Sequence, residues 1–310
     1  MVVTLLGFRA GWKVLMLPFL MRFSFVLAMC VGTVGLSSAA FAQDVRGPSG
    51  REFRFEKVEF ESGSESLFSK AVRVHGYYSP AATESTVGIA ILNPACEGLM
   101  APDGTQVKRK YFRMAKYLAT GGFTVMAVDG FNPRGASEIC TKPKLMKESD
   151  RFLDALAGLK YLRQRPELRE LPAVAVGWGA AGVIPGFQMA AEPAQFAAGI
   201  AYYGECEKVP TPFRPAAPLL IMGGDKDEWN PVRFCVALAS QSDRNAPAME
   251  VHVMENAYHA FDNPQGEPKP NTVNPKLGMA GRSEAATKES FQLVSAFLAR
   301  HFGFKPKAGL

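Results

Sequence analysis

Hydrophobic and polar positions alternate in two stretches near the start of the folded region. Residues 52–60 set phenylalanine and valine between charged neighbours, and residues 71–78 alternate again. A period of two is typical of a β-strand that buries one face and leaves the other in water. The two stretches therefore predict a pair of antiparallel strands.

Six later runs are short and almost wholly apolar, at residues 87–92, 123–128, 173–176, 199–203, 218–222 and 251–254. Helical periodicity covers residues 106–120, 150–164, 183–191 and 284–302. Strands that are apolar on both faces and alternate with helices predict an α/β fold with a doubly wound, mainly parallel sheet. Residues 263–281, which are rich in proline and glycine, predict a long surface loop.

Residues 1–42 have the composition of a secretory signal peptide. Their three charged residues are all basic, an apolar stretch follows, and Ala40-Phe41-Ala42 forms a cleavage site of the small-residue type. A membrane anchor over residues 14–36 is the competing interpretation, and the presence of this cleavage site argues against it. We expect cleavage after Ala42, a single domain over residues 43–310, and a periplasmic or secreted protein with no remaining membrane contact.

Charge and cysteine content narrow the classes of partner and compartment. Loss of the three basic residues lowers the formal net charge from +6 to +3, which argues against a nucleic-acid partner. Cleavage leaves Cys96, Cys140, Cys206 and Cys235 in an oxidising compartment. Four cysteines allow three pairings, and the sequence alone does not choose among them.

The segment from Gly177 to Gly182 lies between a strand pattern and a helix pattern and fits two motifs. As G-x-G-x-x-G it is a dinucleotide fingerprint, and Glu205 stands near the expected position of a ribose-binding acid. As G-x-S-x-G it is a nucleophile elbow in which Gly179 replaces the nucleophile. The first interpretation predicts a dinucleotide-dependent oxidoreductase, and the second predicts a hydrolase fold.

An acid and a histidine follow in the chain order of a hydrolase triad. Asp227 comes after the strand pattern at 218–222, and His259 comes after the next one at 251–254. A carboxylate and an imidazole on consecutive strand ends can hydrogen-bond, which fixes the tautomer of the histidine. Asp225 is the alternative acid and is less favoured because it can cap the loop instead. The chain order of the acid and the histidine favours the nucleophile-elbow interpretation, since the oxidoreductase hypothesis does not explain that order.

At this point the chain resembles the dienelactone hydrolase family of α/β-hydrolases, specifically its exported single-domain members. The resemblance covers residues 87–302 and is carried by the segments 93–99, 129–135, 176–178, 224–227 and 258–261. It implies an α/β-hydrolase fold that acts on carboxylic esters or lactones, with Asp227 as the triad acid and His259 as the base. No residue cluster has metal-ligand spacing, so we expect no metal, and we expect no cofactor.

Gly179 departs from the family pattern, which has Ser or Cys at this position. Without Oγ or Sγ no covalent intermediate can form, and loss of a triad nucleophile costs on the order of 10⁶ in turnover. Glycine also removes the strain of the elbow backbone. Beside the oxidoreductase, two hypotheses remain. The first is a degenerate ester or lactone hydrolase, and the second is a non-catalytic descendant that binds a small ligand or a protein in the same cleft.

Backbone N–H groups are the candidate oxyanion donors, from Ala180 and from the loop that contains Cys96. The negative charge of Glu97 weakens this assignment. Cys96 as a replacement nucleophile is less favoured than Cys96 in a disulfide, for which Cys140 is a candidate partner; Cys206 and Cys235 would then form the second pair.

Arg134 and Trp178 are the candidate substrate-binding residues. Arg134 lies on a loop at the carboxyl edge of the sheet, where it could receive a substrate carboxylate or pair with Glu138 instead. Trp178 could stack on a ligand, although packing within the elbow is favoured. The expected partner is therefore a small ester, lactone or carboxylate.

Overall fold

The computed structural model describes residues 45–46, 54–63, 72–189, 195–243 and 245–305. The expected signal peptide, residues 1–42, lies outside these ranges, so it stays a prediction. Within them, no helix combines the length and the hydropathy that crossing a bilayer requires.

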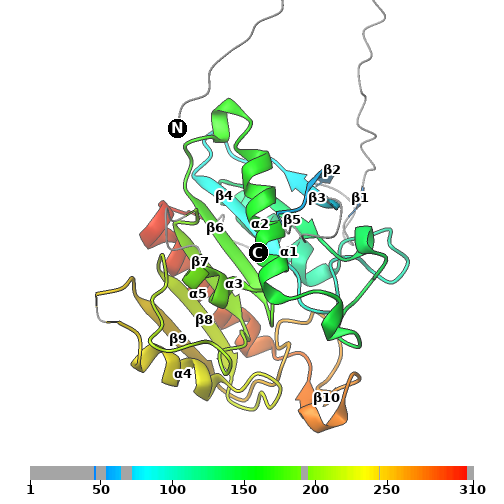
Figure 1. The fold of residues 1–310 in the computed structure, drawn as a ribbon, viewed down its shortest axis with the longest axis vertical. Helices are drawn as coiled ribbons and strands as arrows, with labels where there is room; N and C mark the ends of the chain where they lie inside the picture. Colours follow the sequence, from blue (N-terminus) through cyan, green and yellow to red (C-terminus); the bar gives the residue numbers. More distant parts are fainter. Residues whose placement is uncertain (1–44, 47–53, 64–71, 190–194, 244, 306–310) are drawn as a thin grey trace, which may run out of the picture. The chain divides into compact units, whose positions relative to one another are not determined.

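The described strands form a nine-stranded sheet in the order β1-β2-β3-β5-β4-β6-β7-β8-β9 (Figure 1). They are β1 (Val45–Arg46), β2 (Arg54–Glu61), β3 (Arg73–Ser79), β4 (Gly88–Asn93), β5 (Phe123–Asp129), β6 (Ala173–Trp178), β7 (Ala198–Tyr202), β8 (Leu219–Gly224) and β9 (Met249–Met254). The pairs β1–β2, β2–β3 and β3–β5 are antiparallel, and all pairs from β5 to β9 are parallel. The predicted doubly wound, mainly parallel sheet is confirmed.

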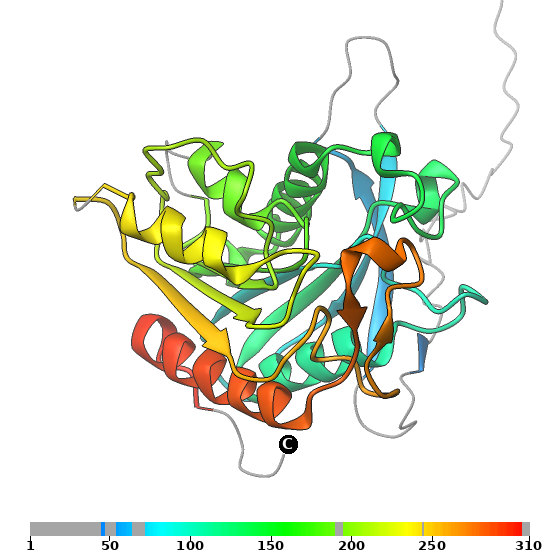
Figure 2. The same cartoon turned by 90° about the horizontal axis from the view of Figure 1, so that it is seen from below.

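Helices cover both faces of this sheet (Figure 2). α1 (Arg109–Thr120) and α5 (Glu284–Phe302) pack on one face, and α2 (Glu148–Leu162), α3 (Val183–Met189) and α4 (Val232–Ser240) pack on the other. Consecutive strand residues enter opposite layers, because side chains alternate across a strand. In β4, for example, Ile91 joins the layer of α2 and Leu92 joins the layer of α1, and neither is exposed.

The predicted helices and strands are present with small shifts of their ends, and the structure adds β1, α4, a short hairpin and short 3₁₀ helices. The helix α4, which begins after Pro231, was not predicted from the sequence. The predicted loop over residues 263–281 contains a short hairpin of β10 (Lys269–Pro270) and β11 (Met279–Ala280). Short 3₁₀ helices occupy Asn132–Arg134, Pro143–Leu145, Pro166–Leu168 and Pro275–Leu277.

Two disulfides join loops at the carboxyl edge of the sheet. Cys96 pairs with Cys140, and Cys206 pairs with Cys235. The first bond ties the loop after β4 to the segment after β5, and the second ties the loop after β7 to α4. The favoured pairing is confirmed.

Gly182 and Gly104 offer a matched test of how tightly α2 packs against the turn after β6. Both glycines have positive φ, +77° and +69°. A Cβ on Gly182 would lie 2.3 Å from the carbonyl oxygen of Glu148, whereas a Cβ on Gly104 would meet nothing within 4 Å. We expect Gly104→Ala to lower the free energy of unfolding by about 1 kcal/mol, and Gly182→Ala to lower it by about 3 kcal/mol or more. Urea denaturation measures both; equal losses would contradict this packing.

Candidate active site

The buried acid and histidine lie on neighbouring loops at the carboxyl edge of the sheet. Asp227 follows β8, His259 follows β9, and their Oδ2 and Nδ1 atoms are 2.8 Å apart. The other carboxylate oxygen of Asp227 accepts the backbone N–H groups of Trp229 and Asn230, at 2.9 and 2.8 Å. Asp227 is therefore fixed on both oxygens, and its bond to His259 orients the ring.

Two aromatic rings enclose His259. Trp229 stacks on the imidazole with ring centroids 4.5 Å apart, and Tyr203 lies at 4.6 Å. His259 is 6% exposed, and its Nε2 makes no hydrogen bond to any residue that the structure describes. The ring is therefore held through Nδ1 and by packing against Trp229 and Tyr203.

Gly179 has the backbone of an elbow. It follows β6, its φ is +58°, and its N–H donates to the carbonyl oxygen of Tyr202 at 2.9 Å. A Cβ built on Gly179 would meet only the Cβ of Ala95, at 3.9 Å. The position consequently has room for a side chain that faces the loop after β4.

The other two glycines of the motif face protein at close range. A Cβ on Gly177 would lie 2.5 Å from a methyl group of Val183, and a Cβ on Gly182 would meet the Glu148 carbonyl. Close packing of the turn therefore accounts for both glycines without a dinucleotide.

The candidate oxyanion donors lie on two neighbouring segments. Asn93, at the end of β4, pairs in register with Gly177 of β6, so the loop after β4 begins beside the elbow. The N–H of Ala95 donates to the hydroxyl of Tyr111 at 2.8 Å and is thus occupied. The N–H groups of Ala180 and Cys96 have no acceptor within the described residues. They stay the proposed donors.

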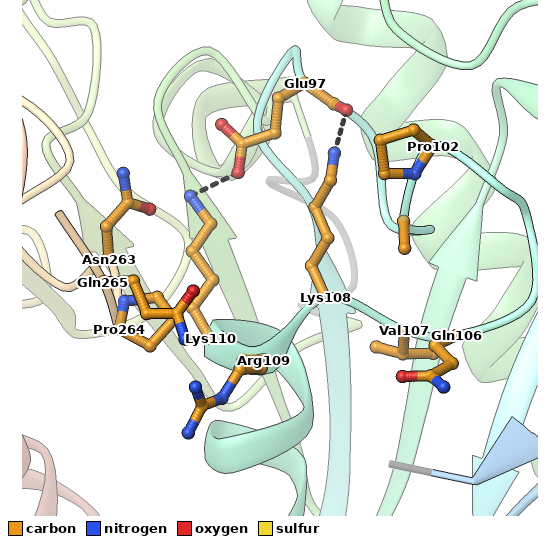
Figure 3. Close-up of a pocket in the computed structure, with 11 residues that line it drawn as sticks. Glu97, Pro102, Gln106, Val107, Lys108, Arg109, Lys110, Asn263, Pro264 and Gln265 are labelled. Carbon is orange, nitrogen blue, oxygen red and sulfur yellow. Dashed lines mark hydrogen bonds and ion pairs between the residues drawn. The ribbon is translucent and has the colours of Figure 1, made fainter. Parts of the chain in front are cut away.

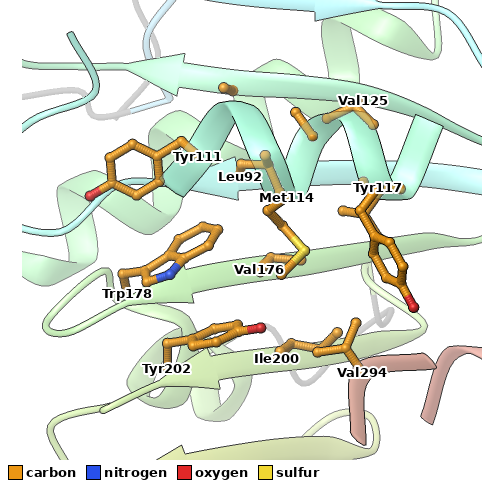
Figure 4. Packing of buried hydrophobic residues seen from close by; sticks show 14 of the residues in the cluster. Leu92, Tyr111, Met114, Tyr117, Val125, Val176, Trp178, Ile200, Tyr202 and Val294 are labelled. Atoms are coloured by element: carbon orange, nitrogen blue, oxygen red, sulfur yellow. The ribbon is translucent and has the colours of Figure 1, made fainter. Parts of the chain in front are cut away.

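Trp178 is fully buried in the aromatic layer under the site (Figure 4). It stacks on Tyr202 at 5.3 Å and meets Tyr111 edge-on at 5.0 Å. Its indole N–H donates to Asp262 at 2.8 Å, and the hydroxyl of Tyr203 donates to the other oxygen of Asp262. The favoured packing role agrees with these contacts, and the ring has no surface for a ligand.

Arg134 is held by Asp154, not by Glu138. Its two terminal nitrogens donate to the Asp154 carboxylate at 2.7 and 3.1 Å, and one of them also donates to the hydroxyl of Ser62 at 2.9 Å. Glu138 instead accepts the N–H of Thr141. A ligand carboxylate would have to displace Asp154, so this contact favours a structural role for Arg134.

A cavity of about 320 Å³ lies between the start of α1 and the loop after His259 (Figure 3). Lys108, Arg109 and Lys110 line it with a single acid, Glu97. Lys110 contacts the Glu97 carboxylate at 2.5 Å, whereas Lys108 donates to the backbone carbonyls of Glu97 and Gly98. Burial alone would raise the pKa of Glu97, but the two lysines outweigh it and hold that pKa below its usual range.

The cationic lining of this cavity was not recognised from the sequence. Lys108, Arg109 and Lys110 are consecutive, and their run was the available signal. Arg109 is exposed and has no ion-pair partner within the described ranges. The remaining lining includes Gln106, Asn263 and Gln265. The cavity therefore carries net positive charge.

Glu148 and Glu205 lie together beside the elbow and line one small recess with Gly179. Burial, and next the charge and hydrogen bond of Glu205, raise the pKa of Glu148 to about 7. Glu205 also pairs with Lys208 at 2.5 Å. The Glu148 carboxyl therefore keeps its proton to near neutral pH.

A sequence model described as the dienelactone hydrolase family matches residues 99–302. No curated protein sequence matches the chain.

Solved structures share the fold at low sequence identity. The acylaminoacyl peptidase of Pyrococcus horikoshii has a TM-score of 0.55 and 16% identity; the match covers 83% of this chain and 43% of the peptidase. The dienelactone hydrolase of Anabaena variabilis has a TM-score of 0.55, 15% identity, and coverage of 79% and 99%. P91, a dienelactone hydrolase-like promiscuous phosphotriesterase from metagenomic libraries, has a TM-score of 0.56, 16% identity, and coverage of 80% and 99%.

The raised pKa of Glu148 predicts a stability that falls with pH. Its pKa is about 7 in the folded protein against an ordinary value of 4.5, so the folded state binds more protons between these values. The contribution of Glu148 to the free energy of unfolding is therefore fully present below about pH 4.5 and is lost as pH rises through 7. We expect Glu148→Gln to raise the free energy of unfolding at pH 8 by roughly 1 kcal/mol and to flatten the pH profile. Urea denaturation from pH 4 to 8 measures this, with the exposed Glu167→Gln as the control; parallel profiles would refute it.

Proposed function

The chain belongs to the dienelactone hydrolase family, and on that premise we propose that it is an exported protein whose cleft takes small carboxylic esters or lactones. The observation that carries this proposal is the 2.8 Å contact between Asp227 and His259 at the same sheet edge as the elbow. The family nucleophile is replaced by Gly179, so the protein is a degenerate hydrolase.

The chemistry that remains is direct attack by water. Nε2 of His259 takes a proton from the water, whose oxygen forms a bond to the acyl carbon, and Asp227 stabilises the resulting imidazolium. The N–H groups of Ala180 and Cys96 receive the oxyanion. Collapse of the tetrahedral intermediate breaks the ester C–O bond, and the histidine returns its proton to the leaving alkoxide. The open space at Gly179 supports this route, because it leaves room for the water.

A non-catalytic descendant that binds a small acyl or carboxylate ligand, or a protein, is the second candidate. Gly179 itself favours it, since loss of the nucleophile costs on the order of 10⁶ in turnover. A dinucleotide-dependent oxidoreductase is disfavoured, because Gly177 and Gly182 are needed for packing.

Export is supported by the two disulfides, which are compatible with an oxidising compartment. We place the mature protein in the periplasm or outside the cell, after removal of residues 1–42.

The cationic cavity favours a ligand that carries a carboxylate. Glu97, in its wall, directly follows Cys96, and Asn263 lies four residues after His259, so the cavity adjoins both loops of the proposed site. Arg109 lines it without an ion-pair partner among the described residues and is the proposed anion contact, in place of the occupied Arg134.

Restoring the nucleophile tests the proposed site. We expect Gly179→Ser to raise hydrolysis of 4-nitrophenyl acetate at least about 100-fold, because the acid, the base and the oxyanion donors are already in position. Gly179→Ala is the matched control, since it adds the same Cβ at positive φ without a hydroxyl. His259→Ala in the serine variant should abolish the gain. A rise of equal size in Gly179→Ala, or no rise in Gly179→Ser, would count against the proposal.

Arg109 tests the proposed substrate class. In the Gly179→Ser background, we expect Arg109→Gln to lower kcat/KM for mono-4-nitrophenyl succinate about tenfold, because a hydrogen bond to a charged group contributes at least ~1.5 kcal/mol. Hydrolysis of the neutral 4-nitrophenyl butyrate should stay the same. The exposed Arg169→Gln is the control. Equal losses for both esters would contradict an anion contact at Arg109.

A further inference from the structure

Arg151 is a buried cation that the triad does not account for. It lies in the first turns of α2 and is 5% exposed. It makes no ion pair with any carboxylate in the described ranges; its two terminal nitrogens donate to the backbone carbonyls of Pro94 and Ala180. A buried guanidinium with only carbonyl acceptors is costly, so its retention calls for a reason.

The two carbonyls belong to the two segments that carry the proposed oxyanion donors. Pro94 lies two residues before Cys96, and Ala180 supplies both a carbonyl to Arg151 and an N–H to the site. One planar guanidinium thus spans the gap between the loop after β4 and the elbow. Its fork geometry restricts the orientation of both peptide segments.

Asn93 makes a second link across the same gap. Its side-chain amide donates to the carbonyl oxygens of Arg151 and Ala181, at 3.2 and 3.3 Å. α2, the loop after β4 and the elbow are therefore joined at one point.

Arg151 also keeps its charge at this point. Burial lowers its pKa to about 10, which still leaves the guanidinium protonated at neutral pH. The ring of Phe131 lies 5.4 Å from the guanidinium carbon and covers it. The positive charge therefore lies behind the peptide groups that would receive an oxyanion, in surroundings where charge is weakly screened.

We propose that Arg151 is the positioning residue of the oxyanion site, where it holds the N–H groups of Cys96 and Ala180 toward one oxygen through the carbonyls of Pro94 and Ala180. It does not touch the ligand. The inference rests on the proposed hydrolase geometry for its consequence in catalysis, but the clamp itself is tested without any activity.

Amide hydrogen exchange measured by mass spectrometry, on variants that keep Gly179, tests the clamp that Arg151 forms between the carbonyls of Pro94 and Ala180. We expect Arg151→Met to speed amide exchange about tenfold or more in residues 95–98 and 180–183 and to leave α5 unchanged. Arg151→Lys should restore part of the protection, because an ammonium can still reach a carbonyl. Arg165→Met is the matched control: Arg165 lies just beyond α2 and stacks on Tyr78 at 4.5 Å. Unchanged exchange in both segments of Arg151→Met would overturn the proposal.

Kinetics in the Gly179→Ser background test the consequence for catalysis. Removing one oxyanion donor outright costs about 10²- to 10³-fold in kcat, so loss of its positioning should cost roughly 10- to 100-fold with KM nearly unchanged. Arg151→Lys should recover most of the loss. A rise in KM at constant kcat would overturn the positioning role. If Gly179→Ser is inactive while exchange still responds to Arg151→Met, the proposed function fails and the clamp stands.

Discussion

The close approach of α2 and α3 to the turn after β6 constrains the rest of the site. A Cβ at Gly177 would lie 2.5 Å from Val183, and one at Gly182 would lie 2.3 Å from the Glu148 carbonyl, so packing imposes glycine at both positions. Gly179 is different, since it has positive φ but open space. Its glycine relieves backbone strain and is not required by any neighbour. The fold therefore accommodates glycine at position 179, and no neighbouring residue demands it.

Buried polar contacts then fix the loops around that turn. Lys110 joins the Glu97 carboxylate to the hydroxyl of Tyr203, and Tyr203 in turn donates to Asp262, which also receives the indole of Trp178. This chain of contacts connects the loop after β4 with Tyr203, which packs against the ring of His259. Satisfied networks of this kind make a loop rigid, because each buried polar group would otherwise lose a partner.

The sequence predicts the sheet well because its strands are apolar on both faces, and it predicts Asp227 and His259 because they follow consecutive strands. It misses α4, whose short apolar stretch begins after a proline, and the hairpin of β10 and β11, which has only two residues in each strand. The contacts of Arg151 with Pro94 and Ala180 join residues 57 and 29 positions apart, so no local pattern reveals them. The same holds for the pairing of Arg134 with Asp154.

Retention of the acid and the base is not by itself a sign of activity. Asp227 accepts two backbone N–H groups in its own loop, and His259 is packed between Trp229 and Tyr203. Replacing either would leave the other buried without its partner, which is destabilising. The contact between Asp227 and His259 can therefore persist for stability alone, with or without a nucleophile at position 179. No packing contact imposes glycine at position 179, because a Cβ there would meet only the Cβ of Ala95, at 3.9 Å. Gly179 is thus the position beside this pair where packing leaves the choice of residue open.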